Sequence, residues 1–382
     1  MAVGGPANTE MPDAPSLIVV AQSARALASS AKRAGYAPLA IDVFGDDDTR
    51  AISRAAITLE GGLSRGLRRP TLIDAVRTFV RQYDVIGLVY GSGFEHQPAL
   101  ISAVAREVRV YGANARALSR AKDPVAVALV CAQSRAAHPQ IELVQPLNCD
   151  GWLTKLRGGA GGGHVRIASR ETAMAPRDYF QRCVHGRSVS ALFVGDGARA
   201  TIVGLSQQWT CPSSRAPFRY GGSVGPIDIS PDRREEIEIA VAGVTRAFGV
   251  VGLASADFVV SDDVAWFIEV NPRPGATLDI FDRDEDPLLA RHVEACEGRM
   301  TTPAARTRCR AAEVVYARGD IACPPRTKWP DWVADRPVGG TKIAADEPIC
   351  TVIATAPDAQ AARRLVADRA QEISTIVEGW TT

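Results

Sequence analysis

The residues best suited to chemistry lie on two short apolar segments, 256–260 and 266–271, which an acidic turn separates. The pattern predicts two strands, and a three-residue turn at 261–263 would place Asp257 opposite Glu269. Successive side chains of a strand point to opposite faces. One face is then expected to carry Phe267, Glu269 and Asn271, and the other Trp266, Ile268 and Val270. Because Mg²⁺ prefers oxygen ligands and keeps water and phosphate as the others, the hairpin predicts a magnesium site at Asp257, Glu269 and Asn271.

Arg273 follows this hairpin directly, between two prolines. Its planar guanidinium suits phosphate or acyl-phosphate oxygens, because it can donate two parallel hydrogen bonds. A catalytic role beside the metal is therefore expected for Arg273. The alternative that these residues leave open is an ordinary amphipathic hairpin with surface carboxylates.

A glycine-rich segment lies upstream, at residues 158–163, between a strand-like segment that ends near Lys155 and another at 165–168. Glycine backbone approaches phosphate oxygens closely because no Cβ intervenes. The segment lacks the Gly-Lys-Ser/Thr ending of a P-loop, and His164 breaks the Gly-x-Gly-x-x-Gly spacing. The pattern predicts a flap over a nucleotide, and a flexible hairpin loop is the alternative. The residues expected at the phosphates are Lys155, Gly159, Gly161, Gly162 and Gly163.

Composition limits the class of protein. The chain has 382 residues, a hydrophobic fraction of 46% and a formal net charge of +1. These values predict two or three packed domains and give no electrostatic reason to bind nucleic acid or an anionic membrane. No apolar run approaches the roughly 20 residues that span a bilayer. The eight cysteines form no Cys-x-x-Cys pair, which argues against a zinc site and a disulfide scaffold. We expect a cytoplasmic protein with a disordered N-terminus at residues 1–14.

The first third of the chain alternates between strand and helix patterns. Strands are expected at 16–21, 38–42 and 85–89, and helices at 24–35, 71–83 and 98–108. This alternation predicts a parallel sheet with flanking helices, whose ligands bind beyond the carboxyl ends of the strands. Ser92 and Glu95 lie at such an end and are expected to line a substrate pocket, as is the loop 44–49. Turn-forming loops with acidic helix caps are the alternative.

Residues 217–226 form a glycine-rich segment that also carries Arg219 and Tyr220. A guanidinium pairs well with a carboxylate through charge-assisted hydrogen bonds. We therefore expect a loop that binds the organic substrate through Arg219, Tyr220, Gly221 and Gly222. An ordered surface loop without a ligand is the alternative.

The glycine segment and the later Asp257, Glu269 and Asn271, in this order and spacing, resemble the ATP-grasp superfamily of carboxylate–amine ligases. The resemblance covers roughly residues 15–300. It implies a mixed α/β and α+β fold, with a Rossmann-like parallel-sheet domain at 15–118 before an ATP-grasp domain at 119–300. Two subdomains would meet at a hinge near 181–186, and residues 301–382 would form a small α+β domain, as in biotin-carboxylase-like enzymes. No Met-Lys-Met motif of a biotin carrier is present.

The resemblance also implies ATP as cofactor, together with Mg²⁺ or Mn²⁺. Lys122 would reach the ATP phosphates, as a basic residue does in relatives. The adenine contacts would come from the backbone at Arg182, Cys183 and Val184. No acidic residue lies between Asp178 and Asp196, where many relatives use a glutamate for the ribose, so Gln181 is expected to take that place.

The reaction implied by the resemblance begins when a substrate carboxylate attacks the γ-phosphoryl group of ATP. An amine then displaces phosphate from the acyl phosphate and leaves an amide.

Segments 23–28, 42–46 and 91–95 resemble ATP-grasp proteins of methanopterin- and methanofuran-linked one-carbon metabolism, which implies glutamate ligation like that of a tyramine–glutamate ligase. The alternatives are a bicarbonate-using enzyme of the biotin carboxylase kind and a non-catalytic ATP sensor. Expected partners are small-molecule carboxylates and amines, and a second copy of the chain in a homodimer.

Overall fold

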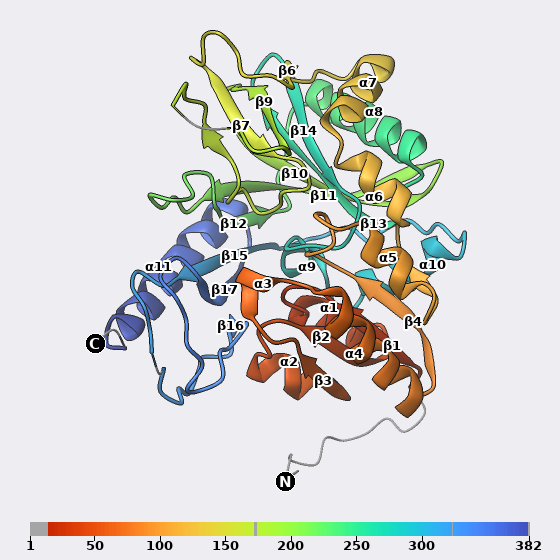
Figure 1. The fold of residues 1–382 in the computed structure, drawn as a ribbon, viewed down its shortest axis with the longest axis vertical. Coiled ribbons are helices and arrows are strands. Elements are labelled where there is room, and N and C mark those ends of the chain that lie inside the picture. Colours follow the sequence, from red (N-terminus) through yellow and green to blue (C-terminus); the bar gives the residue numbers. More distant parts are fainter. Residues whose placement is uncertain (1–13, 172–173, 323, 381–382) are drawn as a thin grey trace.

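The computed structural model describes residues 14–171, 174–322 and 324–380 (Figure 1). The N-terminus that is expected to be disordered therefore lies, apart from Ala14, outside the described residues. The seven cysteines in the described part are free thiols. In that same part, no helix has both the length and the apolar character needed to cross a membrane.

The N-terminal part is a parallel sheet of order β3-β2-β1-β4-β5. Its strands are β1 (Ser16–Val20), β2 (Ala37–Asp42), β3 (Ala55–Thr58), β4 (Val85–Tyr90) and β5 (Val110–Tyr111). Its helices are α1 (Arg25–Arg33), α2 (Asp47–Ile52), α3 (Gly62–Arg65), α4 (Arg69–Gln82) and α5 (Ala99–Val104). The predicted alternation is confirmed, but part of the loop expected at 44–49 belongs to α2, and the short edge strand β3 had not been expected.

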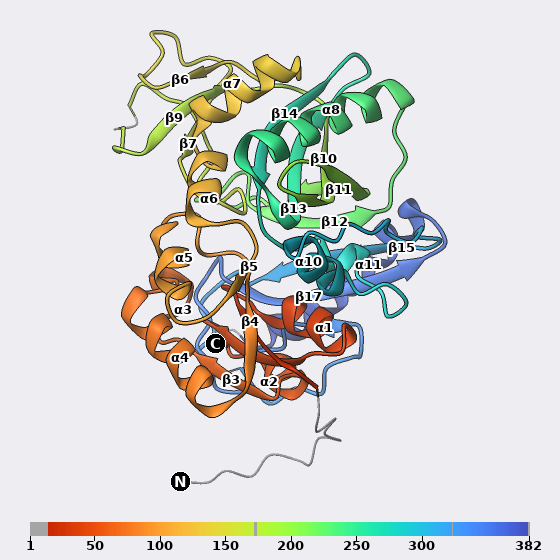
Figure 2. The ribbon, with the colours of Figure 1, turned by 90° about the vertical axis from the view of Figure 1, so that its right-hand side faces the viewer.

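Helices α6 (Ala115–Ala121) and α7 (Pro124–Ser134) lead to a four-stranded sheet of order β6-β9-β7-β8. Pro124 occupies the first turn of α7, and the Asp123 carboxylate accepts a hydrogen bond from the Val125 amide, which caps the helix. The strands are β6 (Ile141–Glu142), β7 (Trp152–Leu156), β8 (Arg166–Ile167) and β9 (Asp178–Arg182). Figure 2 shows this sheet and the α8 end of the large sheet beside each other, at the opposite end of the molecule from the N-terminal sheet.

The large sheet has eight strands in the order β14-β13-β10-β11-β12-β15-β17-β16, with antiparallel pairing. The strands are β10 (Arg187–Asp196), β11 (Ala200–Thr210), β12 (Tyr220–Gly225), β13 (Val251–Val260), β14 (Ala265–Asn271), β15 (Cys309–Tyr316), β16 (Val333–Ala334) and β17 (Pro348–Ala356). The helices around it are α8 (Pro231–Phe248), α9 (Leu278–Phe281), α10 (Leu288–Cys296) and α11 (Ala359–Glu378).

One expectation about this sheet is wrong. Residues 220–225 form β12, an interior strand, although their glycines predict a loop. Because β12 pairs with β15, the C-terminal strands continue the same sheet.

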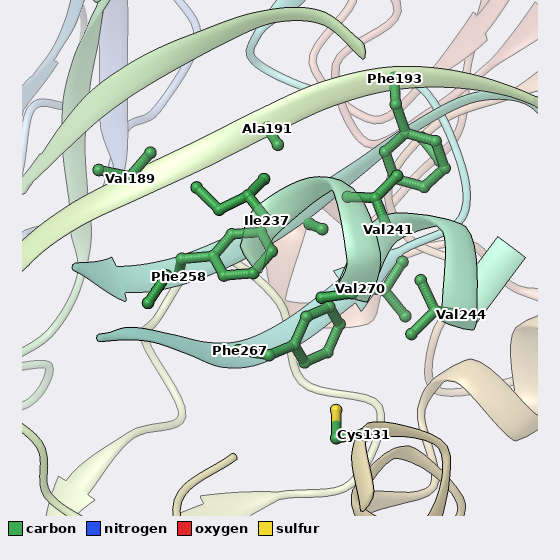
Figure 3. Packing of buried hydrophobic residues seen from close by; sticks show 14 of the residues in the cluster. Cys131, Val189, Ala191, Phe193, Ile237, Val241, Val244, Phe258, Phe267 and Val270 are labelled. Carbon is green, nitrogen blue, oxygen red and sulfur yellow. The ribbon is translucent and has the colours of Figure 1, made fainter. Parts of the chain in front are cut away.

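A hydrophobic core fixes the strands that carry the predicted metal ligands (Figure 3). Helix α8 packs Ile237, Val241 and Val244 against apolar side chains of β10, β13 and β14. The strand residues in this cluster include Val189, Phe193, Phe258, Phe267 and Val270. The rings of Phe258 and Phe267 meet edge to face at 5.3 Å. This packing fixes the strands, so that the polar residues on their opposite face are held in place.

Candidate active site

A cavity of about 760 Å³ lies where the four-stranded sheet, the large sheet and the N-terminal part meet. It collects most of the residues that the sequence singles out. Its wall includes Ser92, Lys155, Gly161, Gly162, Gln181, Arg182, Cys183, Val184, Tyr220, Asp257, Glu269, Asn271 and Arg273. Lys122 and Gly159 line a small adjoining pocket that shares Glu269 and Gln181 with it. Glu95, Gly163, Arg219, Gly221 and Gly222 are not part of either wall.

The hairpin of β13 and β14 places Asp257 opposite Glu269. The connection has four residues, 261–264, and not the expected three. A β-bulge between the Asp257 and Phe258 positions then shifts the register by one residue. Phe267 consequently faces the core while Glu269 and Asn271 face the cavity, so the predicted grouping of Phe267 with Glu269 is wrong. Ile268 lines the cavity, whereas Val270 packs in the core. The prediction that Ile268 and Val270 share one face is therefore also wrong.

The two carboxylates and Asn271 are in direct contact. The Asn271 Nδ2 donates to Asp257 Oδ2 at 3.2 Å and to Glu269 Oε1 at 3.3 Å. The Ser190 hydroxyl, on β10, donates to Asp257 Oδ1 at 2.6 Å. Two carboxylates and an amide suit a hard cation. The Asn271 amide nitrogen now faces the carboxylates, so its side-chain amide must rotate by half a turn before its oxygen can bind the same cation.

Cations surround this group. The Lys122 ammonium donates to Asn271 Oδ1 at 2.6 Å and lies 3.6 Å from Glu269 Oε2. Burial disfavours the charge of Glu269, but Lys122, Lys155 and His164 outweigh it and lower the pKa of Glu269 to about 2. Burial and the Glu269 charge raise the pKa of Asp257 to about 6. A bound cation beside Asp257 would therefore stabilise the ionised form of this carboxylate.

Lys155 projects from β7 and is 4% exposed. It donates to Gln181 Oε1 at 3.1 Å and lies over the Tyr179 ring at 5.9 Å. Burial opposes its charge, yet Tyr179, Glu269 and Asp257 raise its pKa above the usual value. Lys155 is therefore a buried cation that faces the carboxylates. Gln181, the expected ribose ligand, is engaged by Lys155.

The hinge predicted near 181–186 falls at the end of β9 and in the connection to β10. The Arg182 amide donates to Gln140 O at 2.8 Å and the Cys183 amide donates to Gly151 O at 2.8 Å. These two N–H groups are thus already used within the protein. Among the described residues, no backbone partner is found for the Val184 amide, in contrast to its two neighbours.

Arg273 is a buried cation that contacts the N-terminal part. Its Nε and Nη2 donate to Glu95 Oε1 at 2.8 and 2.7 Å. Glu95 is 3% exposed and also accepts from the Gly93 amide at 2.7 Å. The structure does not bring Glu95 to the cavity wall with the other predicted residues, because its carboxylate contacts Arg273 instead. Burial disfavours its charge, but Arg273 and Lys122 hold the pKa of Glu95 below its usual range.

Residues 131–277 match a protein family described as ATP-grasp domain. This chain therefore carries an ATP-grasp domain. A formate-dependent phosphoribosylglycinamide formyltransferase from Anaeromyxobacter dehalogenans is 32% identical over 102 residues. That stretch covers 26% of this chain and 26% of the relative, so the chain aligns with only about a quarter of that protein.

Solved structures agree on the fold over most of the chain. L-amino acid ligase from Bacillus licheniformis superposes with a TM-score of 0.67 at 14% identity, covering 93% of this chain and 96% of the other. The biotin carboxylase domain of Hydrogenobacter thermophilus 2-oxoglutarate carboxylase, solved with MgADP and bicarbonate, gives 0.68 at 13% identity, covering 89% and 86%. At such identities these likenesses establish the ATP-grasp fold and its mixed α/β and α+β architecture.

The glycine segment of the ATP-grasp domain is docked on β12. The Tyr220 amide donates to Gly161 O at 3.0 Å. Gly162 has a φ of +72°, and a Cβ there would lie 2.0 Å from Phe218 O. Gly163, its neighbour, would meet nothing within 4 Å. Only the first of these two glycines is required by the docked conformation.

We expect Gly162→Ala to weaken ATP binding by about tenfold, because the added methyl strains the backbone and pushes the segment off Phe218. Gly163→Ala is the matched control and should bind ATP like the wild type. Isothermal titration of ATP with Mg²⁺ measures both. Equal losses in the two variants would show that the docked conformation is irrelevant to nucleotide binding.

Arg219 lies behind the cavity wall, where its guanidinium is already occupied. It donates to Cys211 O at 2.9 Å and to Asp346 O at 2.9 Å, and pairs with Asp346 Oδ1 at 3.2 Å. It also stacks on the Tyr316 ring at 3.7 Å. These contacts tie β12 to the C-terminal segment, and the structure does not bring Arg219 to the cavity with the other predicted residues.

Arg219→Ala should therefore lower the free energy of unfolding by roughly 1–3 kcal/mol, the usual cost of losing such buried polar contacts. Arg215→Ala, an exposed arginine of the same connection, should cost less than about 0.5 kcal/mol. Urea unfolding compares the two. Unchanged stability together with a raised KM for the organic substrate would support the carboxylate-binding role expected from the sequence.

Several polar residues of the cavity have no motif that reveals them. Ser190 is two residues from Ser188 on β10, and only the register with β13 shows that it meets Asp257. Arg25, Asp279 and Asp335 also line the cavity, although they are far apart in the chain. Arg25 forms hydrogen bonds with Asp279 and Asp335, which are each more than 250 residues away in the sequence, so no local pattern could have found this group.

Proposed function

We propose that this protein is an ATP-dependent ligase that activates a carboxylate as an acyl phosphate and couples it to an amine. One observation carries the proposal. Asp257, Glu269, Asn271, Lys155 and Arg273 converge on a single cavity that the glycine segment borders. This combination suits a triphosphate and a metal better than it suits an uncharged ligand, because it alternates carboxylates with buried cations.

Each residue has a distinct task in the proposal. Asp257, Glu269 and Asn271 would hold Mg²⁺, which neutralises phosphate charge when bound. Lys122 and Lys155 would bind the phosphate oxygens, since both ammonium groups already face Glu269. Arg273 would stabilise the charge on the transferring phosphoryl group or on the later tetrahedral oxyanion. The glycine segment 158–163 would exclude water, which would otherwise hydrolyse the acyl phosphate.

The nucleotide base would lie at the hinge, against the Val184 amide. The reaction needs no serine or cysteine nucleophile, because positioning and charge stabilisation account for phosphoryl transfer. We propose glutamate as the first carboxylate to test, given the resemblance to cofactor-linked ATP-grasp proteins. The homodimer expected from relatives stays a prediction.

The test is ADP release by the purified protein with ATP and Mg²⁺ or Mn²⁺, in three arms: glutamate with an amine panel, bicarbonate, and no addition. Stimulation by glutamate and an amine supports the ligase. Stimulation by bicarbonate alone identifies the carboxylase-like alternative. Tight ATP binding without ADP release in any arm would identify a nucleotide sensor and overturn the proposal.

A further inference from the structure

The cavity continues past Arg273 to an acidic end that the proposed ATP site does not use. Arg25 of α1, Asp279 of α9 and Asp335 of the segment before β17 line it. Arg25 donates to both oxygens of Asp279 at 2.5 and 2.7 Å. It also donates to both oxygens of Asp335 at 3.1 and 3.0 Å. The guanidinium is thus committed to two carboxylates and is poorly placed to bind a substrate carboxylate.

Negative charge exceeds positive charge at this end. Behind Asp335 lie three further aspartates, Asp42, Asp46 and Asp48. The Asp48 carboxylate accepts the Asp335 and Arg336 amides at 2.9 and 3.0 Å, and the Asp42 carboxylate accepts the Gly45 amide at 2.9 Å. Arg25 interacts with Asp279, Asp335, Asp46 and Asp48, and Arg310 also interacts with Asp279. Burial, reinforced by Asp335, Asp42 and Asp48, raises the pKa of Asp46 to about 9, so Asp46 is protonated at neutral pH and the negative charge comes from the other carboxylates.

An uncharged hydroxyl, which can both donate and accept a hydrogen bond, lies near these carboxylates. Thr277 lines the cavity two residues before Asp279 and is 5% exposed. Within the described residues its Oγ1 has no hydrogen-bond partner. A buried hydroxyl without a partner costs free energy, so a polar ligand at this position would be stabilising. The excess negative charge specifies that such a ligand is a cation.

We propose that this end of the cavity binds the amine substrate through a second, positively charged nitrogen, held by Asp279 and Asp335. This inference rests on the proposed ligase function and narrows its acceptor to a diamine or another amine with a distal cationic group. The bound nitrogen is not the nucleophile, because carboxylates stabilise its protonated form and an ammonium has no lone pair for attack. The reacting amine is the other end of the molecule, directed toward Arg273.

An organic cation suits the site better than a metal ion. Asp279 and Asp335 each spend both oxygens on Arg25. Asp335 also accepts from the Ser23 hydroxyl at 2.9 Å and from Thr351, so most of the lone pairs that remain for N–H donors are on Asp279. Divalent-ion binding is nevertheless an outcome that the experiment must distinguish.

Two probes of equal chain length test the proposal: 1,4-diaminobutane and the uncharged 1,4-butanediol. Each is titrated calorimetrically into the full chain with ADP and Mg²⁺, so that no turnover is required. We expect the wild type to bind the diamine at least about tenfold more tightly than the diol. In Asp335→Asn the ratio of diamine to diol affinity should fall below about threefold. Asp279→Asn, read in the same titrations, gives the same test should Asp335→Asn not fold.

Asp284→Asn is the matched control, because the Asp284 side chain is 89% exposed on the surface near Arg33. It should keep the wild-type preference. Equal binding of the two probes, a preference that survives both Asn variants, or competition between the diamine and Ca²⁺ would each overturn the proposal. ADP release in the glutamate and bicarbonate arms separately decides the ligase function, so either can fail without the other.

Discussion

Replacing Glu269 with Gln is expected to reduce turnover by roughly a thousandfold while the fold is retained. The substitution keeps the size and the contact with Asn271, but it removes a negative charge that Lys122 and Lys155 face. A metal ligand that helps to stabilise charge during phosphoryl transfer commonly raises the reaction rate by about two to three orders of magnitude. ADP release at saturating ATP measures the effect, and thermal unfolding checks the fold.

Glu285→Gln is the control for this variant, because Glu285 is exposed and lies outside the cavity wall. It should turn over like the wild type. Wild-type ADP release by Glu269→Gln would show that the hairpin of β13 and β14 holds no catalytic cation, and the amphipathic hairpin left open by the sequence would then be the better description.

Arg273→Lys is expected to lower kcat by about a hundredfold with little change in the KM for ATP. Lysine keeps the charge but cannot reproduce the fork that contacts Glu95. Arg318→Lys, at a side chain that is 73% exposed, should have no effect. Single-turnover formation of ADP separates the chemical step from product release. A loss of ATP affinity equal to the loss in kcat would place Arg273 in the ATP-binding site and not at the reacting group.

Glu95→Gln tests whether Arg273 is positioned from the N-terminal part. It keeps the side-chain shape but removes the charge that pairs with Arg273, so kcat should fall by roughly tenfold. The pH dependence distinguishes positioning from a merely structural role. Protonation of Asp257, whose pKa is raised, should lower kcat in both proteins. Since the Glu95 pKa is held below its usual range, its protonation should cause a further loss of kcat at more acidic pH in the wild type, and Glu95→Gln should lack that further loss. An identical loss of kcat at acidic pH in both proteins would contradict the positioning role.

Local patterns predicted much of this molecule. The βα alternation at the N-terminus, the hairpin and the glycine segment all follow from residues that are close in sequence. Their periodicity and turn residues specify local structure directly. Most of the predicted ATP and metal residues therefore reach the same cavity.

Long-range pairing decided the rest. The bulge at Asp257 depends on cross-strand register, which no single strand encodes. The glycine-rich β12 is a strand because β11 and β15 pair with both of its edges, and because Gly222 leaves room for the Trp209 ring. Glu95 and Arg273 are 178 residues apart, so their pairing was invisible to motif analysis.

Transfer of ¹⁸O from a labelled carboxylate to inorganic phosphate tests the central claim most directly. The acid that stimulates ADP release is prepared with ¹⁸O in its carboxyl group and incubated with the protein, ATP, Mg²⁺ and an amine. Attack of the carboxylate on the γ-phosphoryl group predicts one ¹⁸O atom in each phosphate released with the amide. Phosphate without label, formed alongside ADP, would mean that water attacks ATP instead, and it would contradict the account of this cavity as the site of a carboxylate–amine ligase.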